Sequence, residues 1–404
     1  MLMRPILLAM AAVATLPITA QAEPWRRAYV AEWMEPAWYF PGQPGGEAAP
    51  GKDCPKGANP GIDKRNALKT SYRTWEEVDK ILDPEKPQWT RYGGIRGPNG
   101  ENVYEKPWLV PDTKQLAPVQ TDLAEGFDLD GNPRTGFKNA DGGKPGVDNS
   151  FYRIAGCWIA YRGPERRSQN GSYANEFMRN GRISIVMVVS GQGADPDNDP
   201  NVKVAFHFTS DQRVTGPVGQ VLPNYSFRIS ADPRFQSLAE ARTVSGVIES
   251  KVPSQLKLHD LVNAGFFPPQ LVLERAQFRF KPDEGGAMRG LIGGYQAIDA
   301  IYTPWAAAGS THESVVRIDI PALWHALRRS ADYKLSPNSK ENDGISTAFR
   351  FYWVPARAIE PDATREVTEA KLYLGAEDPK LSRQVRPSAG GQRRQVADTP
   401  AQPN

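Results

Sequence analysis

The chain has 404 residues, with 49 Lys and Arg against 46 Asp and Glu, giving a formal net charge of +3. Because phosphate binding needs a clear excess of basic residues, this balance argues against nucleic acid as the main partner. Gly and Pro number 36 each and aromatic residues make up 10%, which is typical of a loop-rich globular protein with enough apolar side chains for a core.

Residues 1–22 have the organisation of a secretory signal peptide. Arg4 supplies a positive charge, residues 6–16 are almost entirely apolar, and Ala20-Gln21-Ala22 forms a small-x-small cleavage site. A membrane anchor is less favoured, because a spanning helix needs roughly 20 apolar residues and no later segment reaches that length. The sequence therefore predicts a soluble mature protein without a transmembrane segment, either periplasmic or secreted.

Residues 23–120 contain recurrent Pro and Gly with interleaved aromatic residues. We expect an irregular arm that packs on the core and is not a free linker. Trp33, Trp38 and Tyr39 cluster near its start and are candidates for a ligand-binding platform, although packing of the arm against the core is the favoured role. Further along the arm, Thr74-Trp75-Glu76-Glu77 is a capping box that predicts a short helix.

Cys54 in this arm and Cys157 are the two cysteines of the chain. An even number of cysteines in an exported protein predicts a disulfide, and their distance in sequence does not suit a CxxC metal or redox pair. A bridge would close a loop of about 100 residues, for which a chain-entropy treatment gives up to about 4–5 kcal/mol.

The segment Asp128-Leu129-Asp130-Gly131-Asn132 is the most specific local motif. It places side-chain oxygens at alternate positions around a tight glycine turn, and Ca²⁺ prefers such a cage of oxygens. The segment resembles the calcium loops of FG-GAP and integrin-type repeats and, more distantly, the EF-hand loop. The resemblance implies that Asp128, Asp130 and Asn132 bind a structural Ca²⁺.

The motif departs from both calcium-loop patterns. Gly136 stands at the ninth position, which is usually acidic in the repeats, and Asn139 stands at the twelfth, where the EF-hand has Glu. Asp141 and Asp148 are candidates to complete the shell. The alternative is a polar turn held by Asx hydrogen bonds without a metal.

Beyond this loop, a helical pattern gives way to alternating strands. Asp148 is the expected N-cap of a helix over residues 149–161. Residues 182–190 and 201–209 alternate with a period of two and predict a hairpin. The Gly-rich segment 290–294 predicts a bulge or a close backbone approach. Further strands are expected over 225–230, 243–249, 271–280, 290–302, 315–320, 345–354 and 367–374, and further helices over 256–264 and 321–331.

Many short strands with polar loops and few helices indicate a mainly β protein. We expect a β-sandwich or jelly-roll-like core over residues 121–376, with a few short helices and the irregular N-terminal arm. Residues 377–404 have almost no bulky apolar side chains and are expected to form a disordered tail.

No catalytic constellation is legible in the sequence. The GxSxG elbow and the glycine-rich phosphate loops are absent, and the four histidines lack ligand spacing. The sequence favours a non-catalytic protein that binds a small molecule, a glycan or another protein. The alternatives are an extracellular hydrolase that acts on glycan or another polymer through carboxylates from distant segments, and a structural component of an envelope assembly.

Overall fold

The computed structural model describes residues 24–39, 53–55, 74–82, 99–109, 112, 116–158, 161–162, 171, 175–176, 178–179, 184–259, 270–316 and 319–361. The expected signal peptide (1–22), the strand expected over 367–374 and the expected tail (377–404) lie outside these residues.

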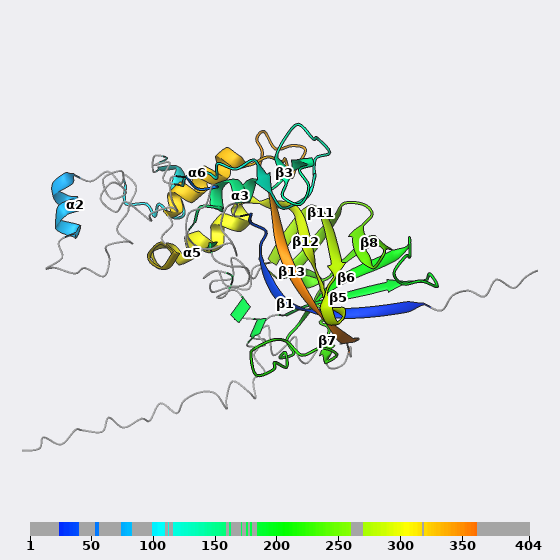
Figure 1. Cartoon of the computed structure of the whole chain (residues 1–404). Helices are drawn as coiled ribbons and strands as arrows, with labels where there is room; N and C mark the ends of the chain where they lie inside the picture. Colours follow the sequence, from blue (N-terminus) through cyan, green and yellow to red (C-terminus); the bar gives the residue numbers. More distant parts are fainter. Residues whose placement is uncertain are drawn as a thin grey trace, which may run out of the picture.

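Eight antiparallel strands form a closed β-barrel (Figure 1). Each strand pairs with two neighbours, and the last strand pairs with the first to close the ring. In ring order the strands are β1 (Trp25–Pro36), β5 (Ser184–Gly191), β6 (Val202–Thr209), β8 (Ser237–Val244), β9 (Val247–Ser250), β11 (Gln270–Pro282), β12 (Met288–Ala297) and β13 (Gly344–Ile359).

The expectation of a sandwich or jelly roll is therefore wrong. Those folds stack two separate sheets, whereas here a single sheet closes on itself through the pairing of β1 with β13. Alternation along a strand predicts which side chains are buried but not which strands are neighbours. The same sequence pattern consequently suits either architecture.

The closing strand β1 comes from the segment that we expected to be an irregular arm. Tyr29 and Ala31 face the main core, the pairing with β13 shifts register between Ala31 and Trp33, and Met34 is the next side chain in that core. Such a shift reverses the phase of the alternation. Because β1 has no continuous period of two, its sequence does not reveal a strand.

Aromatic side chains fill the inside of the barrel. Phe206 packs against Phe278 with ring centroids 5.7 Å apart, and Phe280 packs against Trp353 at 5.6 Å. All four belong to the main buried core. The barrel interior is thus a packed core, as is usual for barrels of this strand number.

Helices gather at one end of the barrel (Figure 1). They are α3 (Ser150–Ala155), α5 (Ile298–Val316) and α6 (Ile320–Ser330), and their apolar faces join the main core. At the predicted capping box, α2 (Trp75–Leu82) begins with the Glu77 amide donating to the Thr74 hydroxyl. No helix in the described segments is long and apolar enough to cross a membrane. Within the described residues there are also short 3-10 helices, η1 (Pro107–Leu109), η3 (Pro233–Phe235) and η4 (Glu284–Gly286).

The remaining strands lie outside the ring. β7 (Ser226–Arg228) runs parallel to β13, and β10 (Ser254–His259) pairs with β11 beyond the end of β9. A separate small sheet consists of β2 (Leu123–Ala124), β3 (Phe137–Asn139) and β4 (Pro145–Val147). This small sheet carries the predicted calcium loop between β2 and β3.

Several segments differ from their expected secondary structure, among them the strand expected over 290–302, because β12 ends at Ala297 and α5 begins at Ile298. The helix expected over 256–264 is wrong at its start, because Leu256 and Leu258 alternate with Lys257 and belong to β10. The strand expected over 315–320 is also wrong, since α5 extends to Val316 and Asp319 caps the N-terminus of α6. By contrast, β5 and β6 form the predicted hairpin.

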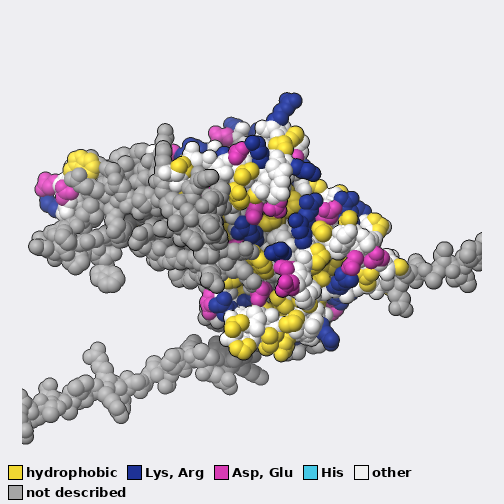
Figure 2. Space-filling view, in the orientation of Figure 1, with side chains coloured by type: hydrophobic (Ala, Val, Ile, Leu, Met, Phe, Trp, Pro, Cys, Tyr) yellow, Lys and Arg dark blue, Asp and Glu magenta, His cyan; other side chains and the backbone are white. Residues whose placement is uncertain are grey.

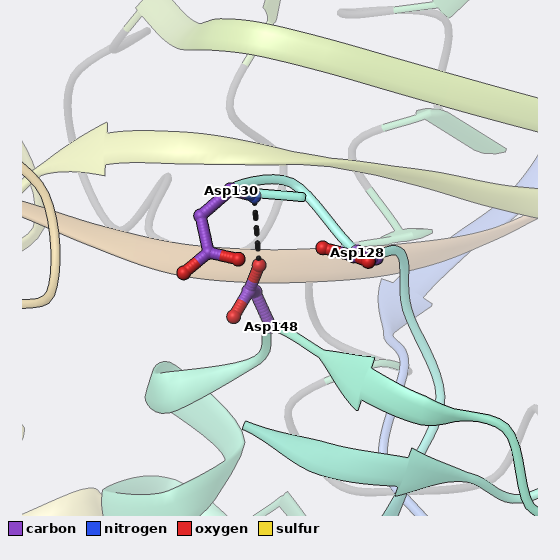
Figure 3. Close-up of side chains that lie close together, drawn as sticks. All are labelled: Asp128, Asp130 and Asp148. Atoms are coloured by element: carbon purple, nitrogen blue, oxygen red, sulfur yellow. Dashed lines mark hydrogen bonds between the residues drawn. The ribbon is translucent and has the colours of Figure 1, made fainter. Parts of the chain in front are cut away.

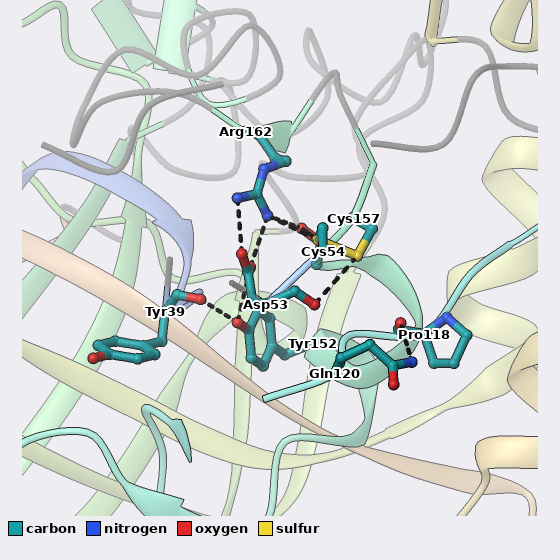
Figure 4. The surroundings of a disulfide bond; sticks show 9 residues. Tyr39, Asp53, Cys54, Pro118, Gln120, Tyr152, Cys157 and Arg162 are labelled. Atoms are coloured by element: carbon teal, nitrogen blue, oxygen red, sulfur yellow. Dashed lines mark hydrogen bonds and ion pairs between the residues drawn. A yellow bond between two sulfur atoms is a disulfide. The ribbon is translucent and has the colours of Figure 1, made fainter. Parts of the chain in front are cut away.

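Cys54 and Cys157 form the disulfide that the sequence predicts, with their Cα atoms 5.8 Å apart (Figure 4). Beside it lies an ion pair whose side chains are completely buried, with Arg162 Nη1 2.8 Å from Asp53 Oδ2. The Tyr152 hydroxyl of α3 lies 3.3 Å from the same Asp53 oxygen. Covalent and ionic contacts therefore fix the chain around residue 54 to the end of α3.

Candidate metal centre and adjoining pocket

Three carboxylates meet at the predicted calcium loop (Figure 3). Asp128 and Asp130 lie on the loop after β2 and are exposed, whereas Asp148 follows β4 and is only 6% exposed. One carboxylate oxygen from each residue lies within 4.8 Å of those from the others. The small sheet thus brings a third acidic group to two that are close in sequence.

Backbone amides hold these carboxylates in place. Asp148 Oδ2 accepts hydrogen bonds from the amides of Leu129 at 2.8 Å and Asp130 at 3.2 Å. The Gly131 amide donates to Asp128 Oδ1 at 2.7 Å. The loop is therefore folded around the Asp148 side chain.

The third predicted ligand, Asn132, is used in the turn itself. Its side-chain oxygen accepts from the Arg134 amide at 3.1 Å, and its own amide donates to Asp130 Oδ1 at 2.7 Å. These are the Asx hydrogen bonds of the alternative interpretation. The structure thus brings together two of the three predicted ligands with Asp148, one of the two candidates to complete the shell, whereas Asp141 is not part of the cluster. The expected role of Asp148 as the cap of α3 is taken by Asn149.

Gly136 stands at a loop position that is usually acidic in the calcium repeats, and the structure shows a steric cause for the glycine. Its φ is +74°, in the left-handed region, and a Cβ atom there would lie 2.3 Å from the Val147 carbonyl oxygen. An acidic side chain at this position would prevent the close approach of β3 to β4. Asp148, the residue after Val147, supplies a carboxylate from the neighbouring strand.

The electrostatics of the centre favour a cation. Burial raises the pKa of Asp148 to about 6, the Leu129 amide opposes this shift, and the neighbouring charge of Asp130 adds to it. A divalent cation would compensate the repulsion between the carboxylates and keep Asp148 ionised. Ca²⁺ takes about 6–8 oxygen ligands, so the three carboxylates would supply part of its shell.

A pocket of about 810 Å³ adjoins this centre. It lies between the outer face of the barrel at β11, β12 and β13, the end of β1, and the small sheet. Lys and Arg side chains are interspersed with Asp and Glu on this face (Figure 2). The charged side chains that line the pocket are Glu35, Glu125, Asp128, Asp141, Lys144, Arg279, Lys281, Arg289 and Arg350.

An ion-pair network occupies one side of the pocket. Arg350 Nε lies 2.7 Å from Glu125 Oε2, and Arg350 Nη1 lies 3.4 Å from Glu35 Oε1. Burial alone would lower the pKa of Arg350, but the charges of Glu125 and Glu35 raise it above the ordinary value. Both glutamates are therefore engaged with one permanently charged guanidinium.

The predicted aromatic platform is placed differently. Trp33 and Trp38 are 5% and 2% exposed, and Trp38 packs against Tyr161 with ring centroids 4.6 Å apart. The Tyr39 carbonyl accepts a hydrogen bond from the Tyr152 hydroxyl. These contacts favour the packing role, and of the three residues only Trp38 lines the pocket.

No protein family, curated protein or solved structure matches this chain. The site is therefore interpreted from its own geometry.

The residues of the network had no local signal in the sequence. Glu35, Glu125 and Arg350 come from β1, from the loop after β2 and from β13, and only barrel closure brings them together. The loop carboxylates Asp128 and Asp130, by contrast, are adjacent in sequence and could be found from their spacing.

Proposed function

We propose that this chain is an exported, non-catalytic binding protein whose ligand occupies the pocket between the barrel and the small sheet. The observation that carries the proposal is the pocket itself, about 810 Å³ in volume and lined from the barrel and the small sheet. Ligand sites commonly measure about 300–1,000 Å³. Because the barrel interior is packed, the outer pocket is the better place for a ligand.

Two further features support this proposal. The Cys54–Cys157 disulfide suits an oxidising compartment, in agreement with the signal peptide expected from the sequence. The carboxylates of Glu35 and Glu125 are held by Arg350, which suits a structural role better than proton transfer.

We assign a structural Ca²⁺ to the carboxylates of Asp128, Asp130 and Asp148. Asp128 also lines the pocket, so the cation would fix one wall of the binding site. Removal of Ca²⁺ would then weaken ligand binding as well as stability.

One observation favours the hydrolase as a second candidate, because two carboxylates from distant segments, Glu35 and Glu125, face the same pocket. Paired carboxylates are the usual machinery for cleaving glycosidic bonds. The two candidates differ in whether a bound ligand is turned over.

The test is a screen of oligosaccharides, peptides and small metabolites by thermal shift, followed by calorimetry and product analysis. We expect a ligand that raises the melting temperature and is recovered intact. Leu291→Trp, which fills the pocket from β12, should weaken its binding at least about tenfold, that is by about 1.4 kcal/mol. Leu238→Trp, on the exposed face of β8, should leave binding unchanged. Recovery of a cleaved product that depends on Glu35 and Glu125 would instead establish the hydrolase.

A further inference from the structure

Two cations face each other directly across neighbouring strands inside the pocket. Lys281 of β11 is the register partner of Arg289 of β12, and both line the pocket. Like charges directly opposite on one face of a sheet are destabilising. Such a local conflict with folding rules is expected at functional sites.

On the same face of the sheet, the neighbouring row of side chains contains an arginine whose charge is balanced by a carboxylate. Arg279 lies one row away on β11 and its Nη2 is 3.0 Å from Glu249 Oε2. In the row of Lys281 and Arg289, Arg289 Nε pairs with Asp283 Oδ2 at 3.5 Å, whereas no ion pair of Lys281 occurs within the described segments.

The opposite wall of the pocket adds a third cation. Lys144 lies just before β4 and likewise has no ion pair among the residues that the structure describes. Of the acidic lining, Glu35 and Glu125 are engaged with Arg350 and Asp128 belongs to the proposed calcium centre, which leaves Asp141 as the one other lining carboxylate among the described residues against these three cations. A concave surface concentrates the field of such charges.

We infer that the ligand of this pocket is anionic and that Lys281, Arg289 and Lys144 bind its carboxylate, sulfate or phosphate groups. The inference rests on the proposed function and specifies the ligand class. An anionic group between Lys281 and Arg289 would remove their repulsion, and the guanidinium of Arg289 would offer a planar pair of donors to it.

The test uses calorimetry on the full chain in the presence of Ca²⁺ with three probes. Trigalacturonate carries carboxylates on a sugar chain, inorganic sulfate is a free anion, and galactotriose is the neutral counterpart of the first. The variant is Lys281→Gln with Arg289→Gln. Its matched control is Lys203→Gln with Arg357→Gln, which removes the same charge from exposed positions on β6 and β13.

We expect trigalacturonate or sulfate to bind, with an affinity that falls at least tenfold in the pocket variant and less than twofold in the control. Binding of trigalacturonate alone would identify a saccharide chain as the carrier of the anion, and binding of sulfate alone a free anion. Absence of binding by both acidic probes, or equal affinities in the two variants, would overturn the inference. Galactotriose binding that Leu291→Trp abolishes and the pocket variant preserves would overturn the inference alone and leave the proposed binding site standing.

Discussion

Among individual residues, Asp148 joins the acidic loop after β2 to the end of β4. It follows β4, accepts the amides of Leu129 and Asp130, and completes the acidic cluster. The sequence identified the loop because Asp128 and Asp130 are neighbours in the chain. It left the role of Asp148 open, because the pairing of β3 with β4 brings this carboxylate to the loop and that pairing has no local signature.

The raised pKa of Asp148 predicts a pH-dependent stability in the absence of metal. Its value is about 6 in the folded protein against an ordinary 3.8, so the folded state binds more protons than the unfolded state between these values. The free energy of unfolding of the metal-free protein should therefore fall as the pH rises from about 4 to 6. Above pH 6 the titration of Asp148 should change it little.

Asp148→Asn lacks this titration and keeps an oxygen for the two amides. Urea unfolding in chelator measures the free energy of unfolding of both proteins. From pH 4 to pH 7 the difference between them should shift in favour of the variant by on the order of 2 kcal/mol, since one pKa unit is worth about 1.4 kcal/mol. A constant difference across this pH range would show that Asp148 does not titrate in this way.

Calcium should stabilise the wild-type chain and fail to stabilise Asp130→Asn. Binding to the folded state alone adds about 2.7 kcal/mol at a hundredfold excess over Kd, which corresponds to a melting temperature higher by several degrees. Asp122→Asn is the matched control, because Asp122 is an exposed carboxylate paired with Lys138 outside the cluster. Identical wild-type melting curves in Ca²⁺ and in chelator would contradict the assignment of Ca²⁺ to this cluster.

Breaking the buried ion pair near the disulfide should destabilise the protein far more than breaking an exposed pair. Arg162→Met leaves the completely buried Asp53 carboxylate without its cation and should cost about 3–5 kcal/mol. Arg179→Met breaks an exposed pair with Glu176 and should cost no more than about 1 kcal/mol. Urea unfolding with the disulfide intact compares the two variants, and similar losses would contradict the assigned role of the buried pair.

Among the elements, strands with an uninterrupted period of two could be predicted, and interrupted strands could not. In the β5–β6 hairpin, β6 alternates along most of its length and β5 contains an unbroken apolar run, and the structure confirms the predicted hairpin. β1 changes phase at its register shift, and the segment expected as one strand over 243–249 turns at Ser245 and Gly246, both at positive φ. Bulges and tight turns thus account for the boundaries that the pattern missed.

The glycines of β12 confirm the predicted close backbone approach and provide a test at this scale. A Cβ atom on Gly290 would lie 1.9 Å from the Arg279 carbonyl oxygen of β11. Gly290→Ala must separate the two strands and should lower the free energy of unfolding by about 3 kcal/mol or more. Gly142→Ala is the control, since nothing lies within 4 Å of its Cβ position. Chemical denaturation of both variants measures the difference, and a wild-type stability for Gly290→Ala would contradict the tight β11–β12 packing.

For the whole molecule, closure of the barrel decides both the fold and the site. Pairing of β1 with β13 turns a set of strands that suits a sandwich into a ring, and it places Glu35 opposite Arg350. This contact joins residues 315 positions apart, a distance over which a single sequence carries no pairing information. The mainly β character and the acidic loop could therefore be predicted, whereas the barrel and its outer pocket required the structure.

The central claim is that a ligand binds in the outer pocket next to the acidic cluster. Hydrogen–deuterium exchange with and without the tightest ligand from the screen locates the binding site directly. Our account predicts slower exchange over residues 125–128, 144–147, 289–291 and 350–352, which carry the pocket lining. Protection confined to another surface, such as the exposed apolar side chains of Val218 and Tyr225 near β7, would contradict it.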